Sequence, residues 1–181
     1  MPSPSGTLLS AVVLVLVTGP ALAGSSSIET SGTAVAIALP LTAAGIALWK
    51  HDKQGFFQLG AATALTVGSA FLLKHVVHEE RPDHSDNQSF PSETAALAFA
   101  PAQFLWSRYG WQYGAPAYLA AGFVGYSRVE AKQHHWWDVV ASAGLSWGFN
   151  RIFTSHYFPP NLYGSASVRS SGAQISLTYN W

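Results

Sequence analysis

Two short segments hold most of the ionisable side chains of this chain, and their residue types suit the binding of a phosphate group. Residues 74–94 contain seven of the 18 Asp, Glu, Lys and Arg residues, and residues 128–138 contain four more. Five of the seven histidines also lie there. The simplest alternative is a pair of solvated loops. Charged side chains beside apolar sequence are expensive to bury, however. Their concentration in two segments therefore indicates a functional site and not only solvated loops.

The order of residues in these segments predicts a specific chemistry. Three cations can neutralise a phosphate dianion, and guanidinium groups bind its oxygens in pairs. A serine hydroxyl can donate to it, and the N–H groups at a helix N-terminus bind anions. A His and an Asp four residues apart share one face of a helix. The segments supplying these groups are Lys74-x6-Arg81-Pro82, Pro91-Ser92-Glu93-Thr94, and Ser127-Arg128-x5-His134-x3-Asp138.

This pattern resembles the three-part signature of the type 2 phosphatidic acid phosphatases, a superfamily that includes bacterial class A acid phosphatases and vanadium haloperoxidases. The first and third parts match at every signature position and in spacing. The resemblance as a whole covers residues 56–153. The resemblance implies that His134 attacks phosphorus and becomes phosphohistidine, while Asp138 holds its other ring nitrogen. It implies that Lys74, Arg81 and Arg128 bind phosphate. It requires no metal or other cofactor.

The middle motif departs from the family pattern, which is Pro-Ser-Gly-His. Here Glu93 replaces the glycine and Thr94 replaces the histidine that protonates the leaving alcohol. A hydroxyl is a poor proton donor, and general acid catalysis contributes about 10²–10⁴-fold. A pyrophosphate substrate needs less help because its leaving group is a phosphate. Glu93, His84 and His78 are alternative proton donors.

Two other functions stay open at this stage. One is a catalytically impaired family member, natural or engineered, that binds phosphate or lipid head groups. The other is a metal site, because His-rich clusters bind zinc, although no strict ligand spacing supports it. Its candidate ligands are His75, His78, Glu79, His84 and His134.

Composition narrows the class of protein. The 181 residues suit one domain; 49% are apolar and only 10% are charged, against about 25% charged in a typical soluble domain. Disorder is therefore excluded. A net charge of zero argues against nucleic acid as a partner. The absence of Cys excludes disulfides and thiol catalysis.

The chain divides into four parts. Residues 1–23 resemble an export signal: an apolar run from Leu8 to Val17 precedes Gly19-Pro20 and a small-x-small site at Ala21–Ala23. An uncleaved first membrane helix is the alternative. We expect a linker at 24–33, a helical phosphatase-like domain at 34–158 and a tail at 159–181.

Five apolar stretches predict an all-α bundle with five or six transmembrane helices. They are rich in Ala, Leu, Val and Gly, which suits close helix packing. Most are shorter than the ~20 residues that span a bilayer, so a soluble periplasmic bundle is the alternative. The stretches are Ala34–Trp49, Phe56–Leu73, Thr94–Trp106, Ala115–Tyr126 and Trp136–Phe153.

Basic residues suggest an orientation for this bundle. With the mature N-terminus outside, Lys50, Lys53, Arg108 and Arg151 fall on the inner side, as the positive-inside rule expects. Both charged segments then face outward, at the periplasmic side of a bacterial-type inner membrane. The expected function is hydrolysis of a lipid phosphomonoester or pyrophosphate there, with membrane lipids as partners and phosphate or vanadate as inhibitors.

The tail has a different pattern. Residues 174–181 alternate polar and apolar side chains, which indicates a strand, and 163–169 can pair with it across Ser170-Ser171-Gly172. A short hairpin, an ordered cap and an unstructured tail all fit this pattern. One hairpin cannot close a membrane barrel.

Overall fold

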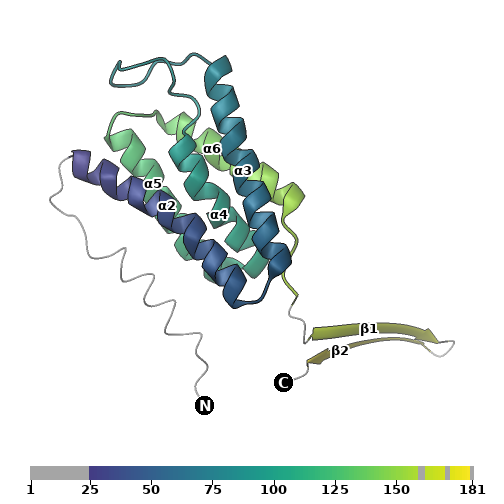
Figure 1. Ribbon diagram of the computed structural model, residues 1–181. Coiled ribbons are helices and arrows are strands. Elements are labelled where there is room, and N and C mark those ends of the chain that lie inside the picture. Colours follow the sequence, from purple (N-terminus) through teal and green to yellow (C-terminus); the bar gives the residue numbers. More distant parts are fainter. Residues whose placement is uncertain (1–24, 159–161, 170–171, 180–181) are drawn as a thin grey trace.

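The computed structural model describes residues 25–158, 162–169 and 172–179, and these form a helical bundle followed by a β-hairpin (Figure 1). The predicted all-α bundle and the hairpin are confirmed, whereas residues 1–23 lie outside the described part. The helices are α2 (Ser25–Trp49), α3 (Lys53–Val76), α4 (Glu93–Tyr109), α5 (Trp111–Glu130) and α6 (Trp136–Phe153).

Helix α4 lies at the centre of the bundle and packs against the other four helices. Its inward positions are mostly alanines, and Ala95, Ala98 and Ala102 are fully buried. Small side chains let helix backbones approach closely, so this core is built from short contacts instead of large interdigitated side chains. The largest fully buried side chain is Phe104, also on α4.

The outer helices expose apolar side chains. Phe57 and Leu72 of α3 are 75% and 67% exposed. Two helices are long and apolar enough to cross a membrane, judged by length and composition alone: Ser27–Trp49 within α2, and α3. Exposed apolar surface of this extent suits contact with lipid.

The predicted linker at 24–33 is wrong from Ser25 onward, because α2 already begins there. Its first turns are polar but helical: the Ser31 and Thr33 hydroxyls donate to the carbonyl oxygens of Ser27 and Glu29, four residues earlier. This extension brings Glu29 to the end of α5, where it contacts a site residue.

The tail forms a two-stranded antiparallel sheet. Strands β1 (Leu162–Arg169) and β2 (Gly172–Tyr179) pair in a register that places Leu162 opposite Tyr179 and Arg169 opposite Gly172. The hairpin projects from the bundle after α6 (Figure 1). It supplies none of the residues that the sequence motifs single out.

A buried ion pair fixes the turn between α2 and α3. Arg108 donates from Nε and Nη2 to the two carboxylate oxygens of Asp52, each over 2.6 Å. The Tyr109 hydroxyl and the Gly55 N–H add bonds of 2.8 Å to the same carboxylate. Burial alone would raise the pKa of Asp52, but the bonds from Arg108, Gly55 and Tyr109 outweigh it and lower this pKa below its ordinary 3.8.

Asp52→Asn is expected to lower the free energy of unfolding by about 3–5 kcal/mol, because it leaves the buried Arg108 guanidinium without its counter-charge. Since the folded pKa of Asp52 is depressed, the carboxylate stabilises the protein above the unfolded pKa, and this is lost as the pH falls through the folded value. Chemical unfolding in detergent measures the change. Exposed Asp83→Asn is the control, and equal losses in both variants would contradict the prediction.

Candidate active site

The three sequence motifs meet at one end of the bundle. Lys74 lies in the last turn of α3, Ser92 is the N-cap of α4, Arg128 lies in the last turn of α5, and His134 and Asp138 flank the start of α6. Because successive helices run in opposite directions, these termini all lie at the upper end of the bundle in Figure 1. The structure therefore places the motifs together at one end of the bundle, as the sequence predicted.

His134 is buried and held in one tautomer. Its Nδ1 lies 2.7 Å from the carbonyl oxygen of Ser89, and 3.5 Å from Oδ2 of Asp138. A carbonyl oxygen only accepts, so Nδ1 carries the proton and the neutral ring keeps the lone pair on Nε2. The ring is thereby set to act as a nucleophile through Nε2.

Asp138 is fully buried, and its Oδ2 lies 3.5 Å from Nδ1 of His134, the ring nitrogen that the resemblance expects it to hold. Its Oδ2 accepts from the Ser89 hydroxyl over 2.5 Å and from the His135 N–H over 2.8 Å, and the latter caps α6. Ser89 thus links Asp138 to His134: its side chain binds the carboxylate and its carbonyl binds the imidazole. Sequence analysis missed Ser89, since nothing in its type or spacing distinguishes it from neighbouring loop residues.

The N-terminus of α4 is tied to α6. The Ser92 hydroxyl accepts from the Ala95 N–H over 3.3 Å, while its carbonyl accepts from the Ser142 hydroxyl over 2.7 Å. The Ser92 hydroxyl keeps its own proton for donation. Because the first N–H groups of a helix lack helical acceptors, this terminus can bind an anion.

Each of the three expected phosphate-binding cations has an oxygen partner in the structure. Lys74 Nζ lies 3.7 Å from Oε1 of Glu93. Arg81 donates from Nε to Asp86 over 2.7 Å and from Nη1 to Gln133. The third, Arg128, contacts Glu29 (carbonyl 2.5 Å, carboxylate 3.6 Å).

These partners were not expected from the sequence, and they keep the cations in place. Glu29 reaches Arg128 from the polar start of α2, 99 residues earlier in the chain. The N–H of Gln88, followed by the Arg81 guanidinium, holds the pKa of Asp86 below its ordinary value, so Asp86 is a carboxylate at neutral pH. A phosphate that enters the site would replace carboxylates as the partner of these cations, whose side chains are already oriented.

The middle motif places Glu93 and Thr94 in the first turn of α4, both half-buried. Glu93 faces Lys74, as its distance shows. The Thr94 side chain has no hydrogen-bond partner among the described residues. Of the other expected proton donors, His84 binds Glu80 over 2.7 Å and is 77% exposed, and His78 is exposed.

The candidate ligands of the alternative metal site do not come together in the described part of the chain. In the described part of the chain, the His and carboxylate groups close enough to share an ion are Glu79, His135 and Asp138, and only Glu79 belongs to the expected set. Trp137 donates to Glu79 over 2.6 Å and stacks on His135 at 4.4 Å between ring centroids. This cluster thus holds the 79–89 loop against α6.

The fold and the site define a helical bundle that gathers cations and a buried histidine at one end, and comparison with known proteins identifies its family. The family model for the PAP2 superfamily matches residues 55–161. The chain belongs to the PAP2 superfamily, as its three motifs indicated.

One curated relative and one solved structure are similar to this chain, the first in sequence and the second in fold. It is 30% identical to a lipid A 4'-phosphatase of Helicobacter pylori strain J99 over 159 residues, which is 79% of this chain and 80% of the relative. The fold is similar to the crystal structure of Aquifex aeolicus LpxE, with a TM-score of 0.59 and 24% identity, covering 80% of this chain and 92% of that one.

Proposed function

We propose that this protein is a metal-independent lipid phosphatase that removes a phosphate monoester from a glycolipid through a phosphohistidine intermediate. The observation that carries the proposal is His134: its Nδ1 donates to the Ser89 carbonyl, so its Nε2 is free to attack, at the end of the bundle where Lys74 and Arg128 also lie. The Helicobacter relative, whose name gives lipid A as its substrate, supports a phosphorylated glycolipid.

The proposed reaction has two steps. Nε2 of His134 attacks phosphorus while the bond from phosphorus to the leaving oxygen breaks, and that oxygen takes up a proton. Lys74, Arg81 and Arg128 offset the charge on the three remaining phosphate oxygens. Water then attacks phosphorus, the N–P bond breaks and phosphate leaves. The second step frees Nε2 and gives up one proton from the water.

The source of the proton for the leaving oxygen is where this chain differs from the family pattern. Glu93 lies 3.7 Å from Lys74, so we assign its carboxylate to that cation and not to the leaving oxygen. Thr94 supplies no proton near neutral pH. The leaving alcohol therefore takes its proton from water, and turnover of alcohol esters is slow compared with that of pyrophosphates. If the missing general acid slows turnover to nothing, the protein binds lipid phosphate without hydrolysing it, which is the second candidate function.

We place the site at the outer face of the membrane. Lys50, Lys53 and Arg151 lie at the opposite end of the bundle from His134, and positive charge is retained on the inner side of membrane proteins. The two membrane-compatible helices, α2 and α3, support an embedded bundle.

Phosphate release from purified protein in neutral detergent tests the function. The substrates are lipid A, phosphatidic acid and a polyprenyl pyrophosphate, with the His134→Ala protein as the blank. Release from lipid A above the blank supports the proposal, and preference for another lipid would correct the substrate. No release from any of them, by protein that still binds lipid A, would establish the binding function.

Gly32→Ala is expected to lower kcat/KM by about 10²-fold, since small displacements of a binding group have effects of this size. A Cβ on Gly32 would lie 1.8 Å from the Ser127 hydroxyl oxygen and 3.3 Å from Nη2 of Arg128. Because Ser127 is buried, α2 must move away from α5 to make room for the new methyl group. This movement takes α2 away from Arg128 as well.

Gly45→Ala is the matched control for this change, because it lies on the same helix and its added Cβ has nothing within 4 Å. We expect its kcat/KM to stay within about twofold of the unmodified protein. A Gly32→Ala protein with normal activity would show that the approach of α2 does not position Arg128.

A further inference from the structure

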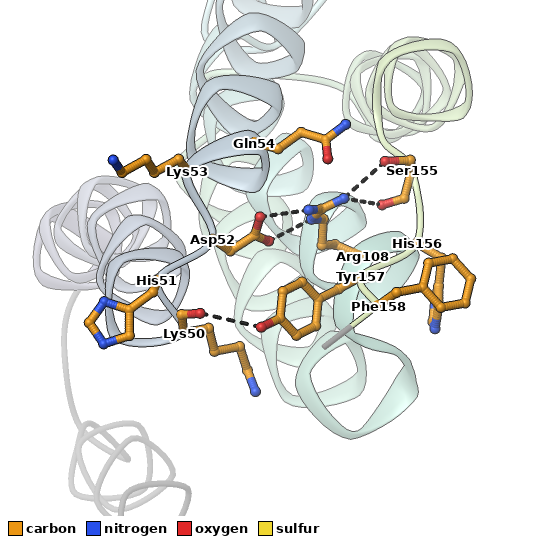
Figure 2. A pocket seen from close by; sticks show the side chains of 10 residues that line it. All are labelled: Lys50, His51, Asp52, Lys53, Gln54, Arg108, Ser155, His156, Tyr157 and Phe158. Carbon is orange, nitrogen blue, oxygen red and sulfur yellow. Dashed lines mark hydrogen bonds and ion pairs between the residues drawn. The ribbon is translucent and has the colours of Figure 1, made fainter. Parts of the chain in front are cut away.

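A cavity lies at the end of the bundle far from His134, and the charged side chains that line it take no part in the proposed reaction. It has a volume of about 470 Å³ and lies around the α2–α3 turn, the end of α4 and residues 155–158 (Figure 2). The 22 residues of α3 from Lys53 to Lys74 separate it from the proposed phosphate-binding end by about 30 Å.

The lining of this cavity carries excess positive charge. Lys50, Lys53 and Arg108 line it with a single carboxylate, Asp52. That carboxylate is fully engaged by Arg108 (Figure 2). Within the described chain, neither Lys50 nor Lys53 has an acidic side chain within 4 Å, so two ammonium groups at this cavity lack a counter-ion.

Lys50 is held in place by aromatic rings. Its Nζ lies 5.0 Å from the Tyr113 ring centroid, 5.5 Å from that of Tyr109 and 5.8 Å from that of Tyr157. The Tyr157 hydroxyl also donates to the Lys50 carbonyl over 3.3 Å. Ring faces attract the ammonium without taking up its three N–H donors, which stay available for an anion.

The position of the cavity indicates which kind of anion it would bind. The two helices that are apolar enough to span a membrane meet at this turn, where one ends at Trp49 and the other begins at Lys53. Trp49 and Phe158 beside it are 51% and 71% exposed. A basic pocket at the end of apolar helices, next to exposed aromatic rings, has the features of a site for lipid head groups.

We propose that this cavity binds the phosphate of an acidic phospholipid head group, with Lys50 as its main ligand and Lys53 at its mouth. Phosphatidylglycerol, an acidic phospholipid of this kind, is a phosphodiester, so a monoester phosphatase would retain it without consuming it. The bound lipid would anchor the α2–α3 turn and the segment after α6 to the membrane surface.

The test is lipid retention by the full chain in neutral detergent, measured by native mass spectrometry with dioleoyl phosphatidylglycerol and dioleoyl phosphatidylcholine. We expect phosphatidylglycerol to bind more tightly than phosphatidylcholine. Lys50→Gln should weaken its binding about fivefold, the effect of one basic residue near a lipid surface. Lys53→Gln, at an exposed position, tests the site independently if Lys50→Gln does not fold.

Arg151→Gln is the matched control. It removes one positive charge at the same end of the bundle, in the last turn of α6, from an exposed residue that does not line the cavity. We expect it to change phosphatidylglycerol binding less than twofold. An equal loss in Lys50→Gln and Arg151→Gln would mean that only general surface charge attracts the lipid, and would overturn the site.

Two further outcomes would overturn the proposal. Displacement of phosphatidylglycerol by millimolar glycerol phosphate would show a site for free phosphate esters and not for a lipid. Loss of the lipid in the His134→Ala protein, with normal binding in Lys50→Gln, would show that it occupies the catalytic end.

Discussion

His134→Ala is expected to reduce phosphate release by about 10⁴-fold or more, because it removes the atom that forms the bond to phosphorus. The ring is buried, and Nδ1 is committed to the Ser89 carbonyl 2.7 Å away. Among the described histidines, His134 is the only one that is buried. Release of phosphate from a lipid substrate measures the change.

His75→Ala is the control for this variant. His75 follows the phosphate-binding Lys74 but is exposed, and its ring bonds to the Phe71 carbonyl of its own helix over 2.8 Å. We expect its activity to stay within about twofold of the unmodified protein. Equal activity of His134→Ala and the unmodified protein would disprove a phosphohistidine intermediate. Trapping of acid-labile labelled phosphate on the unmodified protein, absent from His134→Ala, would support it directly.

Thr94→His is expected to raise kcat/KM for alcohol phosphomonoesters by about 10²–10⁴-fold, the contribution of a placed general acid. Position 94 lies in the first turn of α4, next to the N-terminus that we propose binds phosphate, and its side chain has no hydrogen-bond partner in the described chain to lose. The gain should be much smaller for pyrophosphates or aryl phosphates, whose leaving groups need little protonation.

The leaving-group dependence makes this prediction specific. Thr94→Asn is the control, because it adds a polar side chain without a titrating group, and we expect it to give no comparable gain. A Thr94→His protein with unchanged activity on both kinds of ester would show that another group already supplies the proton. Glu93, beside Lys74, is then the residue to test with Glu93→Gln.

Much of this site was predictable because its chemistry depends on residue type and short spacing. Three cations, a serine before a helix, and a His and Asp separated by three residues define a phosphate site wherever they meet. The apolar stretches likewise predicted the helices: α6 has the expected bounds, and the others extend a few residues beyond theirs into polar turns. Only α2 extends far, through residues that were expected to form a linker.

The support of the site was not predictable, because it depends on which distant atoms come into contact. Ser89 bonds to both His134 and Asp138 across some 45 residues of chain. Glu29 reaches Arg128 only because Gly32 lets α2 approach α5 without a side chain between them. No local pattern encodes either contact.

The sequence by itself determined the class of protein, the helices and the residues that meet in the candidate site, since these follow from composition, hydrophobic pattern and short-range motifs. Only the tertiary structure decided the tautomer of His134, the oxygen partners of the three cations and the cavity around Lys50. The physical reason is that each of these depends on distances of a few ångströms between groups far apart in the chain. Such distances are set by how closely small side chains allow the helices to pack.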